Sequence, residues 1–200
     1  LPEVNAVFEE TVAKLSKSGM HIAEVNLNSP TEKDGEDELT VLLSELDYEM
    51  QKYLSTRTGT RVKSLDDIIS FNNEFSDQEM QYFGQEHFEK AIQISSDRNR
   101  YESARERNQK WANNSLQQGL ADADVLIGCT YGPAWISSLG HGDKVDGGSW
   151  ITMLAAIAGS PIGTLPMGLV SGLPVGLGLV VGKNQESKLI SAMAQVERLI

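Results

Sequence analysis

Apolar residues recur at helical spacing through much of the first half of the chain. Residues 4–15 and 39–54 carry an apolar residue every three or four positions, which predicts two amphipathic helices. A third long helix is expected from Tyr101 to Gly119. Between the first two helices, Met20–Leu27 is short, mostly apolar and closed by Asn-Ser-Pro, so it predicts a strand.

Two serines have the spacing of helix-capping boxes. Ser64 stands three residues before Asp67, and Ser76 three residues before Glu79. These pairs predict two short helices, one ending near residue 73 and the other at Gly84.

The second half of the chain follows a different pattern. Asp124–Cys129 is a continuous apolar run after its first residue, typical of a buried strand. Two further strands are expected at 162–165 and 175–181, separated by a turn-rich connection, and an amphipathic helix from Asn184 closes the chain. Helices that lead into and cover several strands indicate the α/β class.

An uncharged helix precedes these two strands. Residues 150–158 carry no charge on any side, so the helix is expected to be buried. Ser149 is its expected cap, and Gly159 with Pro161 ends it. Because prolines and glycines interrupt the whole uncharged run from residue 147 to 182, we expect no membrane-spanning helix there.

Composition divides the chain near residue 118. Fourteen of the eighteen glycines lie between Gly119 and Gly182, whereas most charged residues precede them. We therefore expect a mostly helical, charged segment at 1–118 and a Gly-rich, sheet-forming segment with a closing helix at 119–200, both in one compact portion.

The net charge limits the classes of partner. Seventeen basic against twenty-eight acidic residues leave a charge of −11, which argues against nucleic-acid and membrane-surface binding. The single cysteine, Cys129, excludes an intrachain disulfide and fits a reducing compartment, so a cytoplasmic location is expected. The chain opens with Leu1 rather than methionine, and we expect it to be part of a longer protein.

The residues alone offer no self-contained catalytic constellation. The three histidines lack metal-ligand spacing, the glycines near Lys183 do not match a phosphate loop, and Cys129 is expected to be a buried structural thiol, so no metal or cofactor is expected. Asn72, at the end of its short helix, either orients a loop or reaches into a site. Trp150, beside the Gly-rich loop, is either a substrate contact or part of the core.

One stretch resembles a known family. Residues 155–168 read Ala-Ala-Ile-Ala-Gly-Ser-Pro-Ile-Gly-Thr-Leu-Pro-Met-Gly, and residues 172–177 read Gly-Leu-Pro-Val-Gly-Leu. Both resemble the C-terminal signature of amidase signature hydrolases, and the segments 42–54 and 64–72 are similar to the peptide amidase branch. The resemblance implies the C-terminal half of that fold, a mixed β-sheet flanked by α-helices.

The resemblance also implies a chemistry that this chain does not carry. The family uses a lysine and two serines, with backbone N–H groups as the oxyanion hole. The nearest match here, Gly147-Gly148-Ser149, is broken by Trp150 and Ile151, so no residue is assigned a catalytic role.

The expected function is therefore that of a C-terminal domain or fragment of an amidase that hydrolyses carboxamide C–N bonds. Its partners would be a small amide substrate and an N-terminal catalytic half, and Phe71, Asn72 and Trp150 would form part of the pocket wall. Two alternatives stay open: the A subunit of a glutamyl-tRNA amidotransferase, and a non-catalytic binding module with the same fold. A sheet cut in half would expose an edge, which predicts self-association or an edge covered by helices.

Overall fold

A computed structural model describes residues 1–142 and 149–200. The chain forms two compact units. The sheet unit comprises Leu1–Pro30, Gln109–Ser137 and the described part of Asp143–Ile200, and the helical unit comprises Thr31–Asn108 and Ser138–Gly142. Each is described by itself. The predicted boundary near residue 118 stays a prediction.

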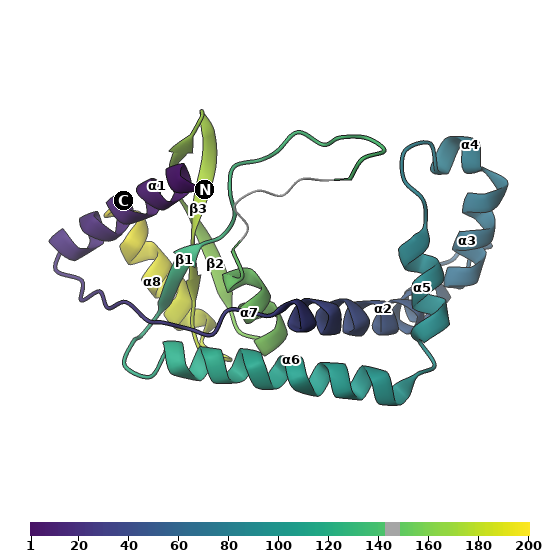
Figure 1. Ribbon diagram of the computed structural model, residues 1–200, viewed down its shortest axis with the longest axis horizontal. Coiled ribbons are helices and arrows are strands. Elements are labelled where there is room, and N and C mark those ends of the chain that lie inside the picture. The colour runs from purple at the N-terminus through teal and green to yellow at the C-terminus, as the bar shows by residue number, and fades with distance from the viewer. Residues whose placement is uncertain (143–148) are drawn as a thin grey trace. The chain divides into compact units, whose positions relative to one another are not determined.

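The sheet unit contains a three-stranded antiparallel sheet within the described residues. Its order is β1 (Leu126–Cys129), β3 (Leu173–Val180) and β2 (Ile162–Val170), with β3 in the centre (Figure 1). The α/β class is confirmed, and the part of the sheet that these strands form is antiparallel. Ser171 and Gly172, with φ of 51° and 80°, form a two-residue turn between β2 and β3 that is tighter than the connection expected from the sequence.

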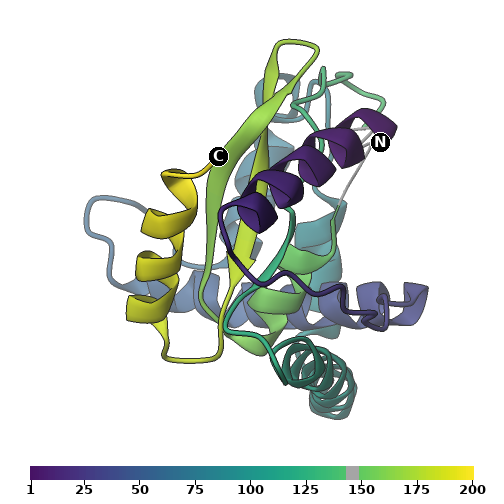
Figure 2. The same cartoon turned by 90° about the vertical axis from the view of Figure 1, so that its left-hand side faces the viewer.

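Helices cover both faces of this sheet. On one face, α1 (Pro2–Lys17) and α8 (Glu186–Glu197) pack against Leu165, Leu177 and Leu179 (Figure 2). On the other face, α7 (Ile151–Ala158) and the second half of α6 (Arg98–Gly119) pack against Val180. The alternation of strand side chains between the two faces produces these two clusters.

Small residues bring α7 close to the sheet. The Ile151 side chain lies over Gly128 and Gly178, where a Cβ atom would be 3.1 Å and 3.6 Å from its carbon atoms. Gly159 ends α7 with a left-handed φ of 66°, as the sequence predicts. The helix begins one residue later than expected, but Ser149 Oγ still accepts a hydrogen bond from the Ile151 N–H at 3.3 Å. Residues Gly147 and Gly148 lie outside the described residues.

In the helical unit, α2 (Glu32–Ser55) and the first half of α6 run antiparallel, because Tyr101 bonds to Glu45 and Arg107 bonds to Asp37. A capping box at Thr31 and Asp34 begins α2, and a second one, at Ser64 and Asp67, begins α3 (Leu65–Glu74) as predicted. The core of the unit consists of side chains from α2, α3 and α5 (Glu86–Ile94), namely Leu43, Leu65, Ala91 and Ile94.

Two expectations of the sequence are wrong, and one helix was missed. Met20–Leu27 forms no strand, because no strand of the described residues pairs with it. The helix expected from Ser76 to Gly84 is a single turn, α4 (Ser76–Glu79), without a side-chain cap. The helix α5 was not predicted. On α2, Leu39 and Leu42 belong to the predicted apolar stripe but are 44% and 58% exposed, so not every residue of the stripe packs in the core.

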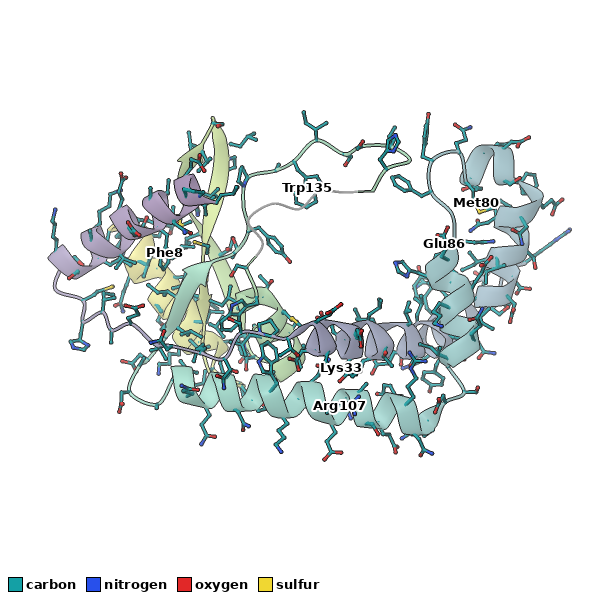
Figure 3. All side chains as sticks on the ribbon, in the orientation of Figure 1. Phe8, Lys33, Met80, Glu86, Arg107 and Trp135 are labelled. Atoms are coloured by element: carbon teal, nitrogen blue, oxygen red, sulfur yellow. The ribbon has the colours of Figure 1, made fainter. Side chains whose placement is uncertain are left out.

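A buried carboxylate ties α2 to α6. Asp37 is 1% exposed and accepts hydrogen bonds from Arg107 Nε at 2.6 Å, Arg107 Nη2 at 2.8 Å and Lys33 Nζ at 2.7 Å (Figure 3). The Arg107 guanidinium, and after it Lys33, lowers the pKa of Asp37 from 3.8 to about 2. The charged form of Asp37 is therefore part of the folded helical unit.

Asp37→Asn is expected to destabilise the helical unit near neutral pH. The pKa shift corresponds to about 2 kcal/mol, and solvent screening of the two half-exposed cations reduces the expected loss to about 1 kcal/mol. Since the folded-state pKa is depressed, this contribution is present above pH 3.8 and disappears as the pH falls towards 2. Urea unfolding followed by far-ultraviolet circular dichroism at pH 7 and pH 2.5 measures it.

The exposed pair Arg98–Glu102 on α6 offers the matched control. Glu102→Gln removes a carboxylate that also contacts an arginine, but from solvent, so its unfolding curve should coincide with that of the parent chain. An Asp37→Asn variant as stable as the parent at pH 7 would contradict the assigned role.

Candidate functional site

Hydroxyl groups gather where β1 ends. The Thr130 N–H donates to the Gly176 carbonyl at 2.9 Å, and its Oγ1 donates to the same oxygen at 3.1 Å. On the neighbouring strand, Thr164 Oγ1 donates to the Leu177 carbonyl at 3.4 Å. A Cβ atom on Gly176 would lie 2.5 Å from Thr130 Oγ1 and 3.1 Å from Thr164 Oγ1, so the absence of a side chain at Gly176 makes room for both threonines.

Ser149 and Thr152 at the start of α7 add two more hydroxyls, and Tyr131 after β1 adds a third. Thr152 Oγ1 lies 3.4 Å from the Tyr131 hydroxyl and 3.4 Å from the Ser149 carbonyl. Tyr131 is 45% exposed and directly follows Thr130 in the chain. We refer to Thr130, Tyr131, Ser149, Thr152 and Thr164 as the β1-end hydroxyl cluster.

The chemistry that the described residues of this cluster offer is hydrogen bonding. Neutral hydroxyls donate and accept hydrogen bonds, as recognition of an amide N–H and C=O requires. Among the described residues, no carboxylate, lysine or imidazole makes a side-chain hydrogen bond to the cluster, so nothing seen there would deprotonate a hydroxyl.

The thiol and the metal-ligating residues add no second chemistry. Cys129 is half-buried at the end of β1, and burial raises its pKa, which disfavours the reactive thiolate. Within residues 1–142 and 149–200, no group of three His, Cys, Asp or Glu side chains is placed to hold a metal ion.

Of the residues predicted for the pocket wall, Trp150 lies in the sheet unit. Its ring meets that of Trp111 edge to face, with centroids 6.2 Å apart, and Trp111 Nε1 donates to the Asn28 carbonyl at 3.0 Å. Trp150 is partly buried against the cluster around α7 and precedes Ile151 and Thr152 at the start of that helix. It therefore packs in the core beside the β1-end hydroxyl cluster.

Phe71 and Asn72 lie in the helical unit, near the end of α3. Asn72 Nδ2 donates to Gln85 Oε1 at 3.1 Å, and Gln85 Nε2 donates to Asn73 Oδ1 at 2.9 Å. Gln85 is 8% exposed, so these amides connect α3 to the start of α5. Phe71 is 44% exposed, with its ring centroid 4.7 Å from that of Phe75. Since each unit is described by itself, a wall shared by Phe71, Asn72 and Trp150 stays a prediction.

Sequence reasoning missed the hydroxyl cluster. Thr130 and Tyr131 come directly after the apolar run of β1, the position where strand ends commonly present binding residues. Thr152 and Thr164, by contrast, are brought to them only by the packing of α7 and by the register of β2 on β3.

The chain also resembles proteins of known structure. Over 97% of its length it is 32% identical to PAM12A, with a TM-score of 0.88, and 31% identical to the peptide amidase from Stenotrophomonas maltophilia, with a TM-score of 0.84. It spans 39% of each of those chains.

Among curated relatives, 89 residues are 34% identical to the A subunit of the glutamyl-tRNA(Gln) amidotransferase of Pseudomonas syringae pv. syringae (strain B728a), and 49 residues are 41% identical to that of Tropheryma whipplei (strain Twist). These matches cover 43% and 24% of this chain but only 18% and 9% of the relatives. The Amidase family model matches residues 1–190, and the chain therefore belongs to the amidase family.

Proposed function

We propose that this chain is the C-terminal part of an amidase that hydrolyses carboxamide C–N bonds, with a lysine and two serines supplied by another part of the polypeptide. The observation that carries the proposal is the likeness to peptide amidases over 97% of this chain and 39% of theirs. The Gly-rich motifs at 155–168 and 172–177 support it, because they form the end of α7 and much of β2 and β3.

The proposed reaction is acyl transfer. A serine oxygen attacks the amide carbon, the C–N bond breaks, and ammonia leaves after the nitrogen gains a proton. Water then attacks the acyl-serine ester, releasing the carboxylic acid and restoring the serine. The reaction needs no redox partner, and in this proposal its proton-transfer groups come from another part of the polypeptide.

The proposed contribution of this chain is recognition of the substrate amide. Tyr131 and Thr152 are partly exposed hydroxyls beside the start of α7, and each can donate to a carbonyl or accept from an N–H. Phe71, Asn72 and Trp150 remain proposed wall residues, with the two aromatic rings suited to apolar groups of a substrate.

A chimera tests the proposal. The part of the Stenotrophomonas maltophilia peptide amidase that aligns with this chain is replaced by this chain, and ammonia release from N-acetyl-phenylalanine amide is measured. We expect turnover by the chimera and none above background by the 200-residue chain alone. Turnover by the isolated chain at the chimera's rate would place the nucleophile here and overturn the proposal. Chymostatin is a competitive inhibitor of the peptide amidase PAM. A chimera that unfolds cooperatively, yet neither turns over nor binds chymostatin, would overturn the proposal as well.

Thr152→Val and Tyr131→Phe in the chimera address recognition. Each removes a neutral hydrogen-bonding group, so KM should rise about three- to tenfold while kcat stays within about twofold. Tyr82→Phe, which removes an exposed hydroxyl from the helical unit, is the control and should leave KM unchanged. An equal fall in kcat for all three variants would contradict a binding role for the cluster.

The A subunit of a glutamyl-tRNA amidotransferase is the second candidate, supported by the 34% identity over 89 residues. The same chimera distinguishes the two, because this alternative predicts that it releases ammonia from glutamine in preference to the peptide amide. The peptide amidase hypothesis is favoured, because the similarity to PAM12A extends over 97% of this chain.

A further inference from the structure

The helical unit contains a pocket that none of the residues proposed for the amide site lines. Its volume is about 600 Å³, within the range of small-molecule sites. Three helices contribute to its lining, with residues between 33 and 43 on α2, between 86 and 94 on α5 and between 100 and 107 on α6. All of these residues belong to the helical unit, so the pocket is formed within one compact unit.

Helical periodicity explains how three helices line one pocket. Lys90 and Ile94 are four residues apart on α5. Arg100, Ala104 and Arg107 follow one another on α6 at intervals of four and three residues. Residues with this spacing lie on one face of a helix, so each helix presents one strip of side chains to the pocket.

Part of the lining is apolar. Leu43, Ile94 and Ala104 are buried, whereas Leu39 lines the same pocket and is 44% exposed. Leu39 is one of the two leucines of the α2 stripe that do not pack in the core. Covering it with an apolar group would remove its side chain from water, which is favourable. The pocket is therefore suited to the apolar part of a ligand.

Two of the four cations that line the pocket are not committed to an internal partner. Lys33 and Arg107 approach from α2 and α6 and form ion pairs with the buried Asp37 (Figure 3). Lys90 and Arg100, in contrast, make no side-chain hydrogen bond or ion pair within residues 1–142 and 149–200. Their charged groups are available to a ligand.

The exposed carboxylates of the lining do not occupy these two cations. Glu36 forms an ion pair with Lys33, at 3.3 Å. Glu86 directs its side chain back towards the turn before α5, because a Cβ atom on Gly84 would lie only 2.9 Å from Glu86 Cδ. Neither carboxylate forms an ion pair with α5 or α6 among the described residues.

The balance of charge favours a ligand with one negative charge. Four basic and three acidic side chains line the pocket, with His87 counted as neutral, which leaves one positive charge in excess. The chain as a whole carries a net charge of −11, so the pocket has the opposite sign. The field of an acidic chain disfavours a polyanion, whereas a monoanion matches the local excess.

We propose that this pocket binds a small monoanionic carboxylate with an apolar body. Arg100 and Lys90 hold the carboxylate, and Leu39 contacts the apolar part. A guanidinium matches the two oxygens of a carboxylate with parallel N–H donors, and an ammonium adds a further charged donor. The acids that the proposed amidase reaction releases belong to this chemical class, but binding in this pocket does not depend on that reaction.

N-acetyl-phenylalanine is the probe, and N-acetyl-phenylalanine amide is its matched neutral compound. Each is titrated into the intact 200-residue chain at pH 7 and followed by amide NMR signals. We expect a Kd on the order of 1 mM or lower for the acid. The amide should bind at least about tenfold more weakly, because a hydrogen bond to a charged group contributes more than one between neutral groups. Equal affinities of the two compounds would overturn the proposal.

The same titration locates the probe. The signals that shift should include Leu39, Lys90 and Arg100 in the helical unit. Those of Tyr131 and Thr152, in the β1-end hydroxyl cluster, should stay in place. Shifts confined to that cluster would assign the probe to the proposed amide site and overturn the pocket. Since no turnover is measured, the pocket can fail while the amidase proposal survives, and the reverse holds as well.

Two variants test the cations. Arg100→Gln and Lys90→Gln each remove one charge from the pocket, and each should weaken binding of the acid at least about threefold. Arg105→Gln removes the same charge from α6 outside the lining residues and should stay within about twofold of the parent chain. Equal losses for all three variants would show a general effect of net charge and overturn the assigned contacts.

A pair of leucine variants tests the apolar contact. Leu39→Ser and Leu42→Ser make the same change at exposed positions of α2, but only Leu39 lines the pocket. Leu39→Ser should weaken binding of the acid at least about threefold, whereas Leu42→Ser should leave it unchanged. Affinity that Leu39→Ser does not alter would overturn the proposed orientation of the ligand.

Phenyl phosphate tests the preference for one charge. It carries between one and two negative charges at pH 7 and should bind no more tightly than N-acetyl-phenylalanine. Binding at least about tenfold tighter than that of the acid would overturn the choice of a monoanion.

The rest of the amidase polypeptide is the competing occupant of the pocket. In the chimera, Arg100→Gln should still weaken binding of the acid. An effect that is present in the 200-residue chain but absent in the chimera would assign the pocket to that polypeptide and overturn the proposal.

Discussion

Leu177→Ala is expected to lower the free energy of unfolding of the sheet unit by about 3 kcal/mol. Leu177 is fully buried in the central strand β3, where it packs with residues of α1, α8 and β2. Removal of its three terminal carbon atoms costs their transfer free energy and leaves a cavity that neighbouring elements cannot close without moving. Urea unfolding followed by tryptophan fluorescence reports on this unit, because Trp111 and Trp150 both lie in it.

Leu173→Ala is the matched control. Leu173 begins the same strand but is 41% exposed, so the same truncation should cost less than about 1 kcal/mol. Similar losses for the two variants would mean that β3 is not the centre of a packed core. An unchanged slope of the unfolding curve would show that only stability has changed.

Local chemistry explains what the sequence predicted well. Ser64 and Asp67 cap α3 through contacts only three residues apart, and Gly159 stops α7 by its own left-handed conformation. Neither depends on a distant part of the chain, so the residue types alone are sufficient to predict them. The apolar run ending at Cys129 does form the strand β1, but its four residues are only partly buried, so the strand is confirmed and its complete burial is not.

The failures concern a segment that has no strand partner among the described residues and two short helices. Met20–Leu27 has the pattern of a strand, but a strand forms only when another supplies its hydrogen bonds. The Ser76–Glu79 pair has the spacing of a capping box, yet the chain turns at Met80, and α5 starts at Glu86 without a side-chain cap. Periodicity alone does not resolve such short helices.

In the candidate site, too, some features depend on local sequence and others on contacts between distant residues. Trp150 was singled out from its place beside the Gly-rich loop, and it does lie at the start of α7. The Tyr131–Thr152 contact joins residues 21 positions apart, and the Thr130–Gly176 bonds join residues 46 apart. These pairs follow from the docking of α7 and the register of β1 on β3, neither of which a single sequence determines.

Gly178→Val is expected to destabilise the sheet unit by about 3 kcal/mol, at the upper end of the cost of overpacking. A Cβ atom at this position would lie 3.0 Å from Thr130 Cγ2 and 3.3 Å from the Gly128 carbonyl oxygen, and the latter belongs to the backbone of β1. The two further carbon atoms of valine would meet Ile151, which would separate α7 from the sheet. Urea unfolding followed by tryptophan fluorescence measures the loss.

Two comparisons separate close packing from a general effect of the substitution. Gly35→Val makes the same change on α2, where no atom lies within 4 Å of the new Cβ position, and should alter stability by less than about 1 kcal/mol. Combining Gly178→Val with Ile151→Ala provides space on the α7 side, so the double variant should lose less than the sum of the single losses. Strict additivity would show that α7 does not press on Gly178.

Because Thr130 lies against the same glycine, a shift there would also displace the β1-end hydroxyl cluster, and Gly178→Val in the chimera should raise KM together with the loss of stability.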